Sequence, residues 1–111
     1  MIRWITYIPT HYNSGQPIPQ ESVDPILRDI ARHFGGYTLF PVGEGAWITP
    51  QGKLQTESMR RLEVIAKSGC IEQARYFALE LGEACQQNSM YFETIPTNCE
   101  FLDIQWNPIV P

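Results

Sequence analysis

A stretch that alternates charged and apolar residues, 57–66, holds the groups best suited to chemistry. Its apolar side comprises Leu62, Val64 and Ala66, and its other side comprises Arg61, Glu63 and Ile65. This period of two is the one that a pleated strand imposes on its side chains. We therefore expect a central strand whose apolar face packs under helices, while Arg61 and Glu63 project from the opposite face toward a ligand or a second subunit.

A carboxylate and a guanidinium, Glu57 and Arg60, lie where the chain enters this strand. At the end of a sheet, a carboxylate can act as a general base, and a guanidinium can hold an anion through paired hydrogen bonds. The simpler interpretation is a salt bridge at the rim of the sheet, which would contribute less than ~1 kcal/mol to stability. The sequence leaves both interpretations open.

Tyrosines and a further carboxylate are expected on the same face as Glu63. Tyr91 and Glu93 share one side of a predicted strand, 89–95, and Tyr7 comes from the first strand. These residue types supply a proton donor and a second base beside the arginines. The candidate general bases are therefore Glu57, Glu63 and Glu93, and the candidate ligand-binding residues are Tyr7, His11, Trp47, Arg60, Arg61 and Tyr91.

His11 and Trp47 each allow a structural interpretation beside the functional one. His11 lies in a proline-rich loop, 9–20, from which it could reach a ligand at the end of the first strand, or simply be exposed to solvent. Trp47 lies between two glycine turns. Because its large apolar area is costly to leave in water, we expect Trp47 to cover the core rather than to bind a ligand.

The remaining periodicity predicts the elements that position these groups. We expect strands at 2–8 and 89–95, helices at 22–34 and 71–87, and an antiparallel meander over 37–66. Ser22 is the expected N-cap of the first helix, Gly35 and Gly36 are expected to end it, and Asn88 is the expected C-cap of the second.

The order strand, helix, two strands, helix, strand predicts a single ferredoxin-like α+β domain over 1–111, with a βαββαβ antiparallel sheet and both helices on one face. The first and third strands are expected at the centre, and the last strand beside the first. Leu102, Ile104 and Trp106 alternate with polar residues in the tail, 97–111. This tail is therefore expected to be an extra edge strand or arm that covers the open face, unless a second subunit does so.

Composition excludes several classes of function. The net charge is -4 and the pI is about 5.0, and no cluster of Lys and Arg is present, so we expect no nucleic-acid partner. No apolar run approaches the ~20 residues needed to span a bilayer, and the N-terminus lacks a secretory pattern, so we expect a cytoplasmic protein.

Three cysteines, Cys70, Cys85 and Cys99, form no closely spaced pair. Cys70 and Cys85 flank the second predicted helix, which places them roughly 22 Å apart, too far for a disulfide. We expect free thiols in a reducing compartment. Neither metal-ligand spacing nor a phosphate-binding glycine loop is present in the sequence, so we expect no metal and no cofactor.

Four short motifs follow one another in the chain: Phe34-x-Gly36-x-Thr38, Gly45-x-Trp47, Gly52-x4-Glu57-x2-Arg60 and Gln87-x-Ser89. In this order, over roughly residues 5 to 94, the chain resembles a family of small uncharacterised bacterial proteins with a ferredoxin-like α+β fold. The resemblance implies no particular activity. It marks Thr38, Trp47, Glu57 and Arg60 as the matching positions.

These observations predict a binding or protein-interaction module that forms a homodimer or a higher homo-oligomer through its sheet face or its C-terminal arm, and that holds a small molecule or a protein partner. The alternative is a small enzyme at the open face or sheet rim, with a Glu base, an Arg anion clamp, and Tyr7 or His11 as donor. A closed cavity lined by these groups would favour the enzyme, and a flat, dry interface would favour the module.

Overall fold

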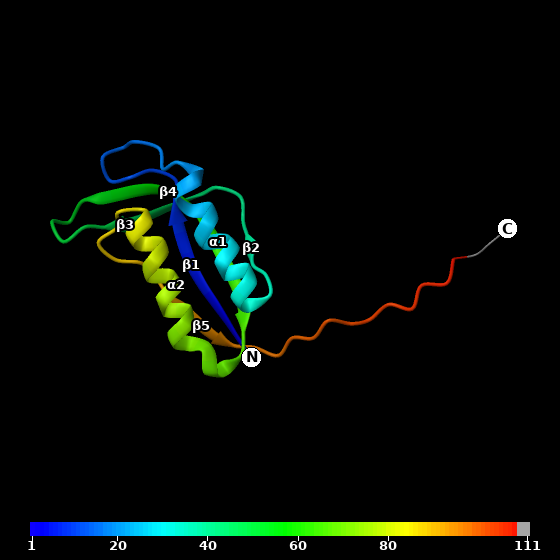
Figure 1. Cartoon of the computed structure of the whole chain (residues 1–111). Coiled ribbons are helices and arrows are strands. Elements are labelled where there is room, and N and C mark those ends of the chain that lie inside the picture. The colour runs from blue at the N-terminus through cyan, green and yellow to red at the C-terminus, as the bar shows by residue number, and fades with distance from the viewer. Residues whose placement is uncertain (109–111) are drawn as a thin grey trace.

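The computed structural model describes residues 1–108, which form one antiparallel sheet with two helices on one face (Figure 1). The strands lie in the order β2-β4-β1-β5, and β3 also pairs with β4. The α+β fold predicted from the sequence is confirmed. The elements are β1 (Ile2–Pro9), α1 (Gln20–Phe34), β2 (Thr38–Leu39), β3 (Gly43–Ile48), β4 (Leu54–Ala66), a 3-10 turn (Ser68–Cys70), α2 (Ile71–Ala84) and β5 (Glu93–Pro96).

The two central strands, β1 and β4, pair along the whole of β1, from Ile2 opposite Ala66 to Pro9 opposite Met59. β5 pairs with the other edge of β1, as predicted for the last strand. Because side chains alternate along each strand, this register decides which residues meet the helices and which face away from them.

The core lies between the sheet and the helices. Leu62, Val64 and Ala66 are 0%, 1% and 3% exposed, so the apolar side of the central strand faces the helices as expected. Trp4 packs edge-on against Phe34 of α1, with ring centroids 5.7 Å apart. Helix residues complete this core, among them Leu27, Ile30, Phe77 and Leu81.

Helix α1 begins two residues before the predicted N-cap. Pro19 is the N-cap and provides no side-chain hydrogen bond, whereas Ser22 lies inside the first turn. The prediction of Ser22 as N-cap was wrong, because Pro19 (φ −60°) already fixes the extended conformation from which the helix starts. At the other end, Gly35 adopts φ 95° and its N–H bonds to the Ala31 carbonyl oxygen, which confirms the predicted glycine stop.

Helix α2 ends earlier than predicted, at Ala84, and Asn88 is not its C-cap. The left-handed residue is Gln86 (φ 55°), and the N–H of Gln87 bonds to the Gly82 carbonyl oxygen at 2.9 Å. This closing pattern satisfies a free carbonyl of the last turn, so no left-handed residue is needed at position 88.

Strand β5 starts at Glu93, four residues later than predicted. The Tyr91 carbonyl oxygen accepts a hydrogen bond from the buried Thr6 hydroxyl at 2.7 Å, in place of a ladder bond from β1. Met90 and Phe92 still pack against the core from this irregular segment. The alternation of side chains predicted for 89–95 is therefore present, but residues 89–92 precede β5 and are not part of the sheet.

The meander is a short β2 followed by a long hairpin of β3 and β4. Only Thr38 and Leu39 form β2, because the chain leaves the sheet before Pro41. β3 pairs with β4 from Gly43 opposite Met59 to Ile48 opposite Leu54, and this hairpin projects beyond the helices (Figure 1). Gly52 adopts φ 80° in its turn, a conformation that favours glycine.

The tail is an arm and not an edge strand of its own sheet. Residues 97–108 contain no strand and run away from the domain (Figure 1). The Thr97 N–H bonds to the Met1 carbonyl oxygen at 3.1 Å, which holds the start of the arm beside β1. The end of the predicted arm, 109–111, lies outside the described residues.

We predict that Leu62→Ala lowers the free energy of unfolding by about 3 kcal/mol, because it leaves a cavity under both helices. Arg61→Ala is the matched control on the same strand, and it should cost less than about 1 kcal/mol because Arg61 projects into solvent. Urea denaturation followed by circular dichroism measures both changes. Equal losses in the two variants would contradict the assigned faces of β4.

Candidate functional site

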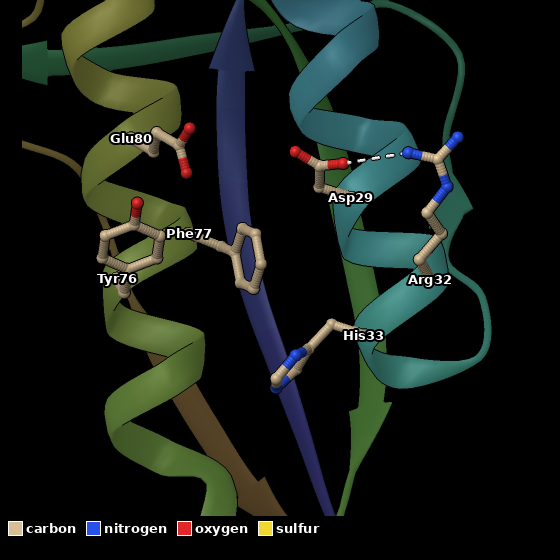
Figure 2. A pocket seen from close by; sticks show the side chains of 6 residues that line it. All are labelled: Asp29, Arg32, His33, Tyr76, Phe77 and Glu80. Carbon is tan, nitrogen blue, oxygen red and sulfur yellow. Dashed lines mark hydrogen bonds and ion pairs between the residues drawn. The ribbon is translucent and has the colours of Figure 1, made fainter.

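A shallow depression of about 420 Å³ lies on the outer side of the helices, and sequence analysis did not identify it. Its lining is Asp29, Arg32 and His33 from α1 and Tyr76, Phe77 and Glu80 from α2 (Figure 2). The His33 ring lies 5.6 Å from the Phe77 ring, and Arg32 pairs with Asp29 at 3.3 Å. The helical spacing of these residues was visible in the sequence, but the pairing of the two helices was not.

Arg60 lies on the helix side of the sheet, at a smaller pocket of about 250 Å³. Its Nε donates a hydrogen bond to the Phe40 carbonyl oxygen at 2.9 Å. Among the described residues Arg60 forms no salt bridge with Glu57, because positions three apart in a strand point to opposite faces. The predicted salt bridge at the rim was therefore wrong, and the separate roles of Glu57 as a base and of Arg60 as an anion clamp stay predictions. The apolar walls of this pocket include Ile8, Ile18, Val23, Leu27, Leu39 and Val42.

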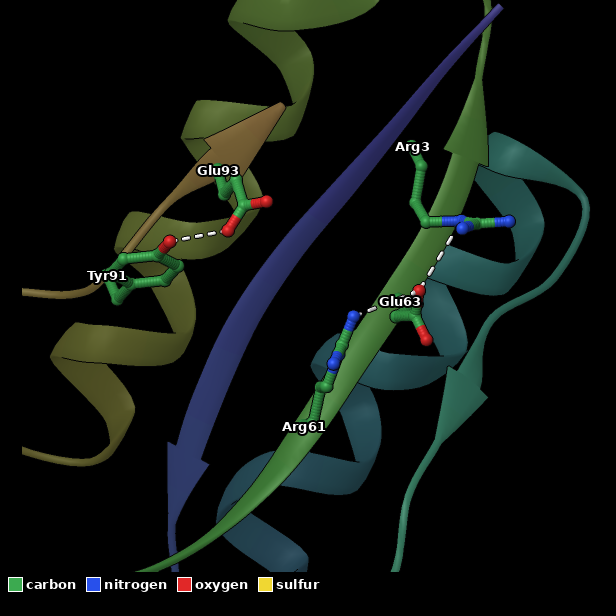
Figure 3. A network of polar contacts seen from close by, with 5 residues as sticks. All are labelled: Arg3, Arg61, Glu63, Tyr91 and Glu93. Atoms are coloured by element: carbon green, nitrogen blue, oxygen red, sulfur yellow. Dashed lines mark hydrogen bonds and ion pairs between the residues drawn. The ribbon is translucent and has the colours of Figure 1, made fainter. Parts of the chain in front are cut away.

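The face without helices, which we call the open face, brings several of the predicted site residues together. Figure 3 shows Arg61, Glu63, Tyr91 and Glu93 there. The register places Ile5 of β1 opposite Glu63 on one side and opposite Glu93 on the other. Tyr7 lies opposite Arg61 in the next pair of this face. Two carboxylates thus flank one buried isoleucine, beside an arginine and two tyrosines.

Glu63 is held between two arginines. Its Oε1 lies 3.4 Å from Nε of Arg3 and 3.5 Å from the guanidinium of Arg61, and its side chain is 15% exposed (Figure 3). The arginine side chains are 42% and 43% exposed. Both cations are thus engaged with one partly buried carboxylate, and the role of Glu63 as a general base stays a prediction.

The other carboxylate, Glu93, accepts a hydrogen bond from the Tyr91 hydroxyl at 2.5 Å (Figure 3). The rings of Tyr91 and Tyr7 lie 5.5 Å apart. The hydrogen bond to Glu93 raises the pKa of Tyr91, with smaller contributions from burial and from the Glu93 charge. The phenol therefore keeps its proton at neutral pH and can donate it in a hydrogen bond.

Phe40 is a member of the open face that sequence analysis missed. Its N–H bonds to the Arg61 carbonyl oxygen at 2.9 Å, and the Arg61 guanidinium lies 5.5 Å from the centre of its ring. This contact combines a cation with an aromatic face, and it limits the positions open to the arginine. No local pattern predicts it, because Phe40 lies beyond the end of β2.

The hairpin carries Trp47 and Glu57 on the strand positions that continue the open face. Trp47 is 45% exposed, so the expectation that it covers the core was wrong. A β carbon added to Gly45 would lie 2.6 Å from the Met59 methyl and 3.2 Å from the Trp47 ring, so both side chains lie over this glycine. Partial burial raises the pKa of Glu57.

His11 lies in the loop after β1 and is exposed. Its Nδ1 is 2.7 Å from the Thr10 hydroxyl. This is the structural interpretation allowed for His11, a solvent-exposed loop histidine; a role in binding stays a prediction.

The three cysteines are free, and Cys85 is fully buried. Burial raises the pKa of the Cys85 thiol to about 11, so this group is not a reactive thiolate at neutral pH.

Within residues 1–108, no group of three or more His, Cys, Asp or Glu side chains is arranged to hold a metal ion. None of the helices in this part of the chain has the length and apolar character needed to cross a membrane.

The fold is shared with solved structures of low sequence identity. A phage SAM lyase in complex with S-methyl-5'-thioadenosine is 16% identical, with 85% of this chain and 79% of that chain covered and a TM-score of 0.65. CutA from Xylella fastidiosa is 13% identical over 90% and 86%, with the same TM-score. The periplasmic divalent cation tolerance protein CutA from Archaeoglobus fulgidus is 13% identical over 91% and 88%, again at 0.65.

At these identities the likeness establishes the fold class and no activity. No family model matches this chain, and no curated protein matches its sequence. The resemblance to small bacterial proteins through Thr38, Trp47, Glu57 and Arg60 therefore stays a prediction. The chain is an α+β protein of the ferredoxin-like class.

We predict that Glu93→Gln lowers the pKa of Tyr91 toward its ordinary value of 10.0, because the acceptor charge that favours the protonated phenol is removed. Tyrosine ring carbon shifts recorded by NMR against pH measure this change. Glu80→Gln, on the helix side, should leave the titration unaltered. An unchanged Tyr91 titration in Glu93→Gln would contradict the hydrogen bond.

Proposed function

We propose that this protein is a small cytoplasmic binding module that associates with further copies of itself through the open face. The observation that supports it most directly is the exposure of large apolar side chains on a face that no helix covers. Tyr91, Phe40 and Ile95 are 54%, 38% and 37% exposed there. Large apolar side chains exposed together on one face are typical of an interaction site.

The charges of the open face are compatible with burial. Arg3 and Arg61 pair with Glu63, and Glu93 accepts the Tyr91 hydroxyl. A charge that already has a partner costs less to remove from water than an isolated one. A second subunit could therefore cover Arg3, Arg61 and Glu63 as paired charges and Glu93 as a hydrogen-bonded one. The three free thiols are compatible with a cytoplasmic location.

Native mass spectrometry and size-exclusion chromatography with light scattering test the proposal. We expect a mass that is a multiple of the 12.7 kDa subunit. Tyr91→Asp should weaken association at least about 100-fold, because a carboxylate would enter an apolar contact. Tyr76→Asp is the matched control, since Tyr76 is also exposed but lies on α2. A single-subunit mass for the wild type at high concentration would refute the proposal.

A second candidate function is a small enzyme or ligand site on the open face, and the arrangement of Glu93 and the two tyrosines favours it. Glu93 has no arginine partner among the described residues, and Tyr7 and Tyr91 offer ring faces beside it. The phage SAM lyase of similar fold holds S-methyl-5'-thioadenosine, a nucleoside thioether. We propose the same ligand class here, with Glu93 or Glu57 as base.

Isothermal titration with S-methyl-5'-thioadenosine tests this second function. Stacking on the tyrosines and a hydrogen bond to Glu93 predict saturable binding, and Glu93→Gln should weaken it about tenfold. Glu80→Gln, outside the open face, should bind as the wild type does. The absence of saturable heat, or equal binding by both variants, would remove this candidate.

A further inference from the structure

We propose that the arm of one copy, residues 97–108, lies in extended form across the open face of a second copy. The inference rests on the proposed self-association and names the segment that makes the contact. It accounts for two features of residues 1–108 together: an arm whose apolar side chains are exposed, and an open face that neither helix covers.

The arm carries the most exposed large apolar side chains of the described residues. Phe101, Leu102, Ile104 and Trp106 are 95%, 77%, 86% and 77% exposed. In an extended chain Leu102, Ile104 and Trp106 fall on one side, and Phe101, Asp103 and Gln105 fall on the other. This one-sided pattern is typical of a strand with one buried face.

The open face is complementary to the arm in apolarity and in charge. Glu100 falls on the same side of the extended arm as Leu102, and residues 97–108 contain no Lys or Arg. The face offers Arg3 and Arg61, each more than 40% exposed although both pair with Glu63. Glu100 of a docked arm would supply these two arginines with a second carboxylate, since one glutamate now serves both. Glu93 on the same face accepts the Tyr91 hydroxyl.

The dimensions of the two surfaces agree. At ~3.3 Å per residue, residues 97–108 span roughly 40 Å, whereas β1, with 8 residues, spans roughly 26 Å. The arm is therefore long enough to cross the whole sheet. The three large apolar side chains on the docked side bury on the order of 450 Å², and an equal area on the face brings one contact to about 900 Å². Two exchanged arms double this to about 1,800 Å², within the range of specific interfaces.

The direction in which the arm leaves the domain favours docking on a second copy over docking on the open face of its own chain. The Thr97 N–H bonds to the Met1 carbonyl oxygen, and the chain then points away from the sheet (Figure 1). An arm that leaves the domain in this direction reaches a neighbour without reversing. Exchange of arms between copies covers every open face and leaves no arm unpaired, so the assembly closes.

A pair of arm variants in the full chain tests the docked side of the arm. Ile104→Asp places a carboxylate on the apolar side, and Gln105→Asp places the same charge one residue away on the polar side. We expect Ile104→Asp to weaken association at least about 100-fold by light scattering and native mass spectrometry, while Gln105→Asp changes it less than about threefold. Equal association of Ile104→Asp and the wild type would overturn the arm inference, and so would equal weakening by both variants.

Mixing variants distinguishes exchange between copies from folding back. Ile104→Asp keeps its open face, and Tyr91→Asp keeps its arm, so an equimolar mixture restores one arm-to-face contact although neither variant associates alone. With one variant labelled with ¹⁵N, native mass spectrometry should show the mixed species. Its absence would overturn exchange. A wild-type oligomer that Tyr91→Asp disrupts and Ile104→Asp does not would retain the proposed function and reject the arm, whereas a monomeric wild type would reject both.

Discussion

The antiparallel pairing of β1 with β4 is the constraint on which the rest of the structure depends. β4 is the longest strand, with 13 residues, and it is bonded to β1, β2 and β3. Its register sends Leu62 and Val64 to the helices and Arg61 and Glu63 to the open face. A shift of one residue would exchange these two sets and place charges under α1 and α2, at a cost of many kcal/mol.

Two helices can cover only one side of this sheet, and the other side is stabilised differently. On the open face, Ile5 is 2% exposed because the neighbouring Glu63, Glu93 and aromatic side chains shield it. The charges there neutralise one another, while the outer aromatic rings remain in contact with water. The open face therefore combines paired charges with exposed aromatic rings, which is the basis of the proposed self-association.

The fold is common to proteins that share few residues, because the pattern of buried positions can be met by many sequences. Identities of 12–16% to CutA proteins and to a phage SAM lyase are sufficient for the same layers and strand order. They do not specify which side chains occupy the open face. The fold class alone therefore does not specify what the protein binds.

The sequence by itself determined the α+β class, both helices and the two faces of the central strand, since these follow from periodicity within a few residues. It also grouped Tyr7, Arg61, Glu63, Tyr91 and Glu93 correctly. Only the tertiary structure decided the separation of Glu57 from Arg60, the exposure of Trp47, the contact of Phe40 with Arg61 and the late start of β5. These depend on register and on bonds between distant residues, such as Thr6 to Tyr91, which no local pattern encodes.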